Sequence, residues 1–217
     1  MCGIVGYIGS KQAAPLIVSG LKRLEYRGYD SAGICCIAPD GLTIAKKAGR
    51  VVDLERAVDL HTLDGTVGVG HTRWATHGVP SDENAHPHTD HSGTIALVHN
   101  GIIENYLTIK KKLANAGYTF KSDTDSEVLA VFIGMLYETL HDLELSVRTA
   151  LAEVEGTFGI VVLSTHEPDV VIAARRGSPL ILGIGNGEYL VASDASAVIS
   201  HTRQVVYLQE NEMAILR

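Results

Sequence analysis

Residues 1–10 read MCGIVGYIGS, and this opening stretch determines how the rest of the chain is interpreted. Residues 3–9 form a short apolar run rich in glycine, which is typical of a buried β-strand. Cys2 stands directly after the initiator methionine. A cysteine at that position is either a small apolar residue at the start of a strand or a reactive group that depends on the chain terminus.

The second interpretation makes Cys2 an N-terminal nucleophile. Removal of Met1 is favoured because the cysteine side chain is small, and it exposes an α-amine on the residue that carries the thiol. An α-amine has a pKa of about 7.7–8.0, so part of it is neutral near pH 7 and can accept a proton. Such a nucleophile carries its own base. A thiol–imidazole pair between Cys2 and His71 or His77 stays open as an alternative.

Composition points to an enzyme-sized protein of a reducing compartment. The 217 residues suit one large domain, and an apolar fraction of 46% suffices for a sizeable core. A net charge of −7 argues against nucleic acid or an anionic membrane as partner. The three cysteines, two of them adjacent (Cys35 and Cys36), do not form a disulfide framework. Without a signal peptide or a membrane-spanning apolar run, we expect a cytoplasmic location.

The hydrophobic pattern places strands at both ends of the chain around a central helical block. Apolar residues at helical spacing predict helices over 12–26, 51–60 and 104–117, and two more within 124–156. Short apolar or alternating runs predict strands at 3–9, 33–38, 42–49, 65–75 and 94–99, and from 157 to the C-terminus. Residues 27–33 and 76–93 are expected to be loops. This order indicates an α+β sandwich of mostly antiparallel sheets.

The stretch HNGIIEN (99–105) allows two interpretations. Asn-Gly between apolar runs is typical of a hairpin turn. Alternatively, the side-chain NH₂ of Asn100 and the backbone N–H of Gly101 form an oxyanion hole, since glycine permits the backbone angle and the close approach. The two interpretations remain open at this level.

Arg73 and Asp125 are candidates for binding a zwitterion. Arg73 lies in HTRWATHG (71–78) and is either a surface charge or a bidentate clamp for a carboxylate. Asp125 is either a helix cap or the partner of an α-ammonium group. Together the two charges would specify a free amino acid. Trp74, the only tryptophan, lies in the same polar loop, and a hinged loop closing over a small ligand explains that position.

Metal and nucleotide sites are weakly supported. HPHTDH (86–91) contains three histidines and a carboxylate, but no further ligand set at helical spacing supports a zinc site. GIGNG (183–187) is not followed by a helical pattern, so it does not predict a dinucleotide site. We expect neither a metal nor a cofactor.

Six stretches together resemble the class II glutamine amidotransferase family. In chain order they are CGIVGYIG, RLEYRGYDSAGI, HTRWATHG, NAHPH, HNGIIENY and SDTDSEV. The resemblance covers nearly the whole chain, and the motifs are highly specific as a set. LEYRGYDSAG and RWATHG favour the branch that makes glucosamine 6-phosphate from fructose 6-phosphate. The glutaminase domain of another class II amidotransferase is the alternative.

The resemblance implies a four-layer αββα sandwich of two antiparallel sheets, the N-terminal-nucleophile hydrolase fold. It also implies roles for individual residues, none of which departs from the family pattern. Cys2 matches the nucleophile, Asn100 and Gly101 the oxyanion hole, and Arg73 and Asp125 the residues that hold the α-carboxylate and α-amine of glutamine. Trp74, Thr76 and His77 match the loop that closes over glutamine. Arg27 and Gly28 match the segment beside the nucleophile.

The implied activity is hydrolysis of the side-chain amide of L-glutamine. It proceeds through a γ-glutamyl thioester on Cys2 after removal of Met1 and yields glutamate and ammonia. Residues 1–217 correspond to the glutaminase domain, without the sugar isomerase domain that follows it in a full-length, homo-oligomeric enzyme. Two rivals remain, namely an N-terminal-nucleophile hydrolase acting on another amide and a non-catalytic glutamine-binding domain.

Overall fold

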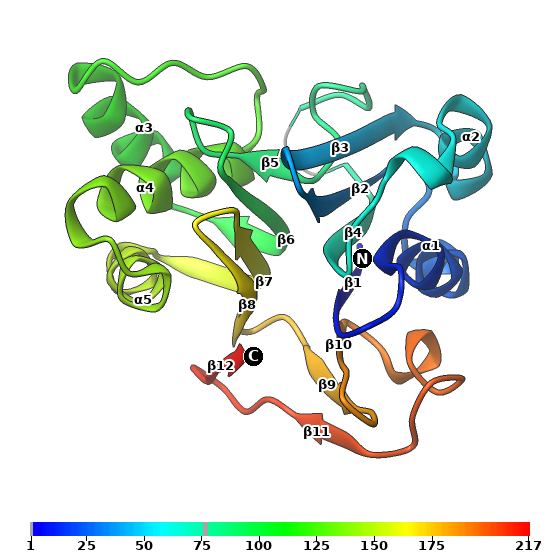
Figure 1. Cartoon of the computed structure of the whole chain (residues 1–217). Helices are drawn as coiled ribbons and strands as arrows, with labels where there is room; N and C mark the ends of the chain where they lie inside the picture. The colour runs from blue at the N-terminus through cyan, green and yellow to red at the C-terminus, as the bar shows by residue number, and fades with distance from the viewer. Residues whose placement is uncertain (1, 76–77) are drawn as a thin grey trace.

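Two antiparallel sheets packed face to face form the centre of the protein, in a computed structural model that describes residues 2–75 and 78–217 (Figure 1). One sheet has seven strands in the order β11-β9-β10-β1-β4-β2-β3, and the other has five in the order β12-β8-β7-β6-β5. The strands of the first sheet are β1 (Gly3–Ile8), β2 (Ser31–Ala38), β3 (Gly41–Ala48), β4 (Val67–Arg73), β9 (Ile181–Ile184), β10 (Tyr189–Ala192) and β11 (Val205–Tyr207). Those of the second are β5 (His88–Thr89), β6 (Ile95–Ile103), β7 (Gly156–Ser164), β8 (Glu167–Arg176) and β12 (Met213–Leu216).

Helices cover the outer face of each sheet, which gives the four layers αββα (Figure 1). Their bounds are α1 (Ala13–Leu24), α2 (Val51–Ala57), α3 (Tyr106–Asn115), α4 (Asp125–Leu140) and α5 (Leu143–Glu153). Within the described part of the chain, no helix combines the length and the apolar character needed to cross a membrane. The predicted α+β sandwich and its four-layer arrangement are confirmed.

The position of strand β1 explains why its sequence is apolar throughout. It lies inside the seven-stranded sheet, between β4 and β10. Ile4 and Ile8 belong to the core between the two sheets, whereas Val5 and Tyr7 belong to the core under α1. A strand buried on both faces needs apolar side chains at successive positions rather than at alternate ones.

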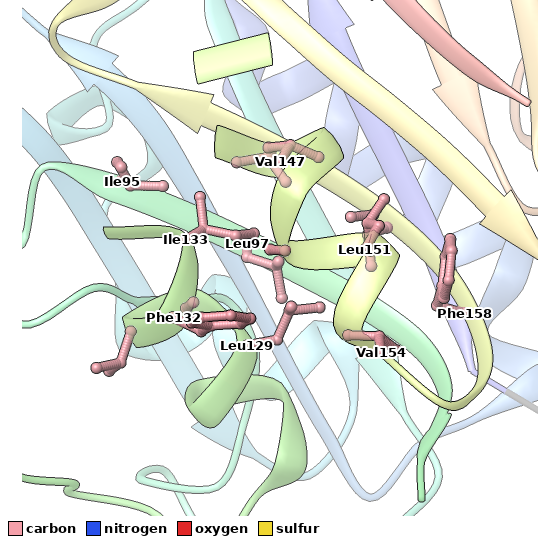
Figure 2. Close-up of a cluster of buried hydrophobic side chains, with 14 of the residues drawn as sticks. Ile95, Leu97, Leu129, Phe132, Ile133, Val147, Leu151, Val154 and Phe158 are labelled. Atoms are coloured by element: carbon pink, nitrogen blue, oxygen red, sulfur yellow. The ribbon is translucent and has the colours of Figure 1, made fainter. Parts of the chain in front are cut away.

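The five-stranded sheet carries the second outer core. Figure 2 shows Leu129, Phe132 and Ile133 of α4 beside Leu97 of β6 and Val147 of α5. Phe132 and Leu97 are fully buried. These contacts fix α4 on the sheet, and with it the N-terminus of the helix, where Asp125 lies.

Helix α4 begins with Thr124 as its cap and Asp125 as its first residue. Thr124 precedes the helix, and its hydroxyl accepts a hydrogen bond from the Glu127 N–H (3.2 Å). The two helices expected within 124–156 are also confirmed. They are separated by His141, whose φ is 50°, and the carboxylate of Asp142 caps the second helix by accepting from the Leu145 N–H (2.8 Å).

The two predicted loops are partly wrong. Residues 31–33 are the first residues of β2, where Ser31 pairs with both Ala48 and Arg73. In the second loop, β5 pairs with β6, and residues 84–88 are buried. The polar composition of 76–93 predicted exposure, but His86 and His88 are buried because they find partners in the core, whereas His91 is exposed.

His86 and His88 form a histidine stack together with His71 of β4. The rings of His71 and His86 are stacked with centroids 4.1 Å apart, and His86 meets His88 edge to face at 4.7 Å. Burial lowers the pKa of His71 to about 3 and the pKa of His86 and His88 well below the usual value. All three rings are therefore neutral at physiological pH.

The histidine stack predicts acid sensitivity of folding. In the unfolded chain these histidines bind protons below pH about 6.5, whereas in the folded chain they stay neutral to much lower pH. The contribution of these histidines to the free energy of unfolding is therefore fully present above pH 6.5 and decreases as the pH falls below it. The decrease is about 1.4 kcal/mol per pH unit for each histidine that is protonated in the unfolded chain and neutral in the folded chain.

Urea unfolding followed by circular dichroism between pH 7 and pH 4.5 measures this slope. In the wild-type protein Thr124 Oγ1 lies 3.0 Å from His88 Nε2, and His88→Gln keeps a group able to bond this hydroxyl. The variant should reduce the slope of the free energy of unfolding against pH by the contribution of one histidine. Carboxylates contribute equally to both proteins, so equal slopes would contradict the assignment.

Candidate functional site

A pocket of about 310 Å³ opens beside Cys2, where segments from both sheets and the start of α4 come together. It brings together most of the residues predicted from sequence. Those that line it are Cys2, Arg27, Arg73, Trp74, Asn100, Gly101 and Asp125. Thr76 and His77 lie outside the described residues.

The Cys2 thiol lies next to the backbone of the segment after β4. Its Sγ accepts a hydrogen bond from the Trp74 N–H (3.1 Å). Burial raises the pKa of the thiol above its usual value, and the Trp74 N–H opposes this increase only in part. The group is therefore a thiol at neutral pH, and a base must remove its proton before sulfur can attack.

The alternative thiol–imidazole pair with His71 is not formed. His71 Nε2 lies 2.9 Å from Asn100 Oδ1, whereas the Cys2 sulfur contacts the backbone groups of Trp74. His71 is also fully buried with a strongly lowered pKa. It is not the base for Cys2 in this arrangement.

Asn100 and Gly101 lie inside a strand, so the hairpin interpretation is wrong. β6 runs without interruption from Ile95 to Ile103 and pairs with β7 through both residues. The side-chain NH₂ of Asn100 donates to the Cys2 carbonyl (3.2 Å). Gly101 has φ +133°, and a Cβ there would lie 2.1 Å from Thr157 O, so the position requires glycine.

Arg73 and Asp125 supply opposite charges to the pocket. Arg73 ends β4, is 4% exposed, and donates to Gly78 O (3.1 Å). Burial lowers the pKa of its guanidinium, but from so high a value that it stays charged. Asp125 begins α4, and its Oδ2 accepts from the Ile103 N–H (2.8 Å). The cap role considered for Asp125 belongs to Thr124.

Arg27 and Trp74 line the pocket, whereas Gly28 lies next to Arg27 and is not a lining residue. Trp74 is 47% exposed and meets the Tyr29 ring edge to face at 5.5 Å. Gly28 packs so closely that a Cβ would lie 2.8 Å from the carbonyl carbon of Arg73. The Arg27 guanidinium lies 3.5 Å from a carboxylate oxygen of Asp194.

Sequence reasoning missed two supporting residues. The backbone N–H of Asp30 donates to Arg73 O (3.0 Å), and its carboxylate accepts from the Ala75 N–H (2.8 Å), so Asp30 anchors the segment that carries Trp74. His99 lies 2.9 Å through Nδ1 from the Ser126 hydroxyl, beside Asp125. Their signal was available, since Asp30 lies in RGYDSAG and His99 directly precedes Asn100.

The histidine-rich stretch does not form a metal centre. Among residues 2–75 and 78–217, no group of three or more histidine, cysteine, aspartate or glutamate side chains is arranged to hold a metal ion. The rings of His86 and His88 instead meet edge to face and contact core groups.

Known proteins share both the sequence and the fold. An enzyme of Chlorobaculum tepidum named glutamine–fructose-6-phosphate aminotransferase [isomerizing] is 53% identical over 221 residues, which cover 100% of this chain and 36% of that protein. The enzyme of the same name from Pyrococcus horikoshii is 48% identical over 216 residues, with the same coverage of 100% and 36%. The chain thus spans about a third of the length of these relatives.

Solved structures of known proteins have the same fold as this chain. Glutamine phosphoribosylpyrophosphate amidotransferase from Bacillus subtilis aligns over 99% of this chain and 47% of its own, with a TM-score of 0.83 and 29% identity. A glutamine aminotransferase class-II domain protein from Silicibacter pomeroyi shares the fold, with a TM-score of 0.65 at 17% identity over 99% of this chain and 94% of its own.

The family follows from a match that covers most of the chain. A sequence model described as glutamine amidotransferase domain matches residues 55–216, which include β4, β6 and the start of α4. These elements carry the oxyanion-hole candidates and the charged pair of the pocket. The chain belongs to the family of glutamine amidotransferase domains.

Proposed function

We propose that this chain hydrolyses the side-chain amide of L-glutamine at Cys2 once Met1 has been removed. The observation that carries the proposal is the shared pocket, in which Arg73 and Asp125 present opposite charges beside the Cys2 thiol. An α-carboxylate on the guanidinium and an α-ammonium on the carboxylate would orient a free amino acid. The pocket volume of about 310 Å³ suits a ligand of that size.

The proposed reaction begins with proton transfer from the Cys2 thiol to its own neutral α-amine, directly or through water. Sulfur then attacks the amide carbon, and the oxygen becomes an oxyanion that accepts hydrogen bonds from Asn100 Nδ2 and the Gly101 N–H. The α-ammonium returns the proton to the leaving nitrogen, and ammonia departs. Water finally attacks the γ-glutamyl thioester and releases glutamate with the free thiol.

The wider role is proposed from the relatives. Their name, glutamine–fructose-6-phosphate aminotransferase, supports transfer of the ammonia to a sugar-isomerising domain that makes glucosamine 6-phosphate from fructose 6-phosphate. Residues 1–217 would be the glutaminase domain of such a homo-oligomeric enzyme. The three free cysteines and the sequence features above support a cytoplasmic location. The 48–53% identities favour this branch over the phosphoribosylpyrophosphate amidotransferases, at 29%.

The first test concerns the nucleophile. Purified protein should release ammonia from glutamine, intact mass should show loss of Met1, and Cys2→Ala should abolish the activity. Cys35→Ala is the matched control, since that cysteine is fully buried in the core. Binding of glutamine without turnover in protein lacking Met1 would identify a non-catalytic domain, and activity in Cys2→Ala would refute the nucleophile.

The second test concerns the carboxylate clamp. Arg73→Ala should raise KM for glutamine about 10- to 100-fold, since a hydrogen bond to a charged group contributes about 1.5–3 kcal/mol. Alkylation of Cys2 by iodoacetamide should stay close to the wild-type rate. Arg56→Ala removes an arginine whose side chain is 77% exposed and serves as control. A normal KM in Arg73→Ala would show that the clamp is elsewhere.

A further inference from the structure

The orientation of the Asn100 carboxamide is determined by its two neighbours. Its Nδ2 lies 3.2 Å from the Cys2 carbonyl oxygen, which can only accept a hydrogen bond. Its Oδ1 lies 2.9 Å from His71 Nε2. Turning the amide over would place two oxygen acceptors against each other at Cys2, so the NH₂ group faces the nucleophile.

This orientation assigns the tautomer of His71. An amide oxygen only accepts, so the hydrogen between the two side chains belongs to His71 Nε2. Because burial keeps His71 neutral, its ring carries a single N–H, and that N–H is directed at Asn100. His71 thus supplies the interaction that favours one orientation of the carboxamide over the other.

The His71 ring has little freedom to leave this position. It is 1% exposed, and the His86 ring is stacked on it at a centroid distance of 4.1 Å and an angle of 16°. His86 is held in turn, because its Nδ1 accepts the backbone N–H of His99 (3.2 Å), the residue before Asn100. The His71 ring, which bonds the Asn100 side chain, is therefore connected through His86 to β6, the strand that carries Asn100.

The His71–Asn100 bond also joins the two sheets. His71 lies on β4 of the seven-stranded sheet, opposite Ile4 of β1, and Asn100 lies on β6 of the five-stranded sheet. Cys2 immediately precedes β1. The bond thus sets the carboxamide of one sheet relative to the nucleophile of the other.

We propose that His71 is a positioning residue that holds the Asn100 carboxamide with its NH₂ toward Cys2, so that one hydrogen bonds the Cys2 carbonyl and the other meets the oxyanion. The proposal rests on the proposed glutaminase function. His71 does not touch the substrate. Its effect belongs to the tetrahedral intermediate, when charge develops on the amide oxygen, and not to the binding of glutamine.

Steady-state kinetics of two variants test the proposal. His71→Leu removes the donor, and His71→Gln retains an NH₂ at about the distance of Nε2. We expect kcat to fall about 10- to 100-fold in His71→Leu, less than the ~10²–10³ for loss of a whole oxyanion donor, and to recover to within a few-fold of wild type in His71→Gln. KM should stay unchanged, because Arg73 and Asp125 hold glutamine.

Alkylation by iodoacetamide separates positioning from a general structural effect. This displacement at a saturated carbon forms no oxyanion, so the Cys2 rate should be unchanged in His71→Leu. His166→Leu, which removes a histidine stacked on Tyr137 away from the pocket, is the control for loss of a ring and should behave as wild type. A parallel fall in alkylation and kcat would overturn the proposal, as would a normal kcat.

A double-mutant cycle with Asn100→Ala tests whether His71 acts through Asn100. If it does, His71→Leu has no further effect on kcat in the Asn100→Ala background. Additive losses would overturn the proposal. Wild-type turnover in the same assay distinguishes failure of this inference from failure of the glutaminase function, which would show as no ammonia release from wild-type protein.

Nitrogen-15 NMR of histidine-labelled wild-type protein provides a readout that needs neither activity nor a folded His71→Leu variant. The His71 signals, assigned by their loss in His71→Gln, should show a protonated Nε2 and a bare Nδ1. The ring should remain neutral at pH 5, where an exposed histidine is charged. The opposite tautomer would overturn the proposal.

Discussion

The apolar contact between the inner faces of the two sheets is the constraint on which the site depends. Side chains such as Ile4 and Val69 from one sheet meet Val98 and Val161 from the other. This contact sets the distance between β1 and β4 on one side and β6 on the other. Cys2, the oxyanion-hole candidates and the charged pair come from separate segments, and they share one pocket because the sheets are held in this register.

Two imidazoles at the edge of this contact, those of His86 and His88, are buried together with hydrogen-bond partners. A neutral imidazole can donate with one nitrogen and accept with the other, so histidines can fill a core position when both sides find partners. His86 accepts from a backbone N–H, stacks on His71 and meets His88 edge to face, and His88 meets the hydroxyl that caps α4. The histidine stack thereby connects Asn100 with the helix start that carries Asp125.

Local sequence predicted most elements because their apolar patterns are strong. The continuous apolar run of β1 and the pair of helices after Thr124 both follow from side-chain chemistry within a few residues. Burial of residues 84–88 could not be predicted in this way, since their polar composition indicates a solvated loop and their partners lie on distant strands. The Asn-Gly pair was ambiguous for a similar reason, because the partners that place it inside a strand and beside Cys2 are far from it in the chain.

The sequence by itself determined the residue types of the candidate site and their order, from Cys2 behind Met1 to the motifs around Arg73, Asn100 and Asp125. Those types identify the chemistry, because a thiol, an amide donor and opposite charges have fixed bonding capacities. Only the tertiary structure decided that Asn100 faces Cys2 and that His71 bonds Asn100 and not the thiol. Such choices depend on distances of about 3 Å between strands far apart in the chain, and those distances exist only once the two sheets have packed.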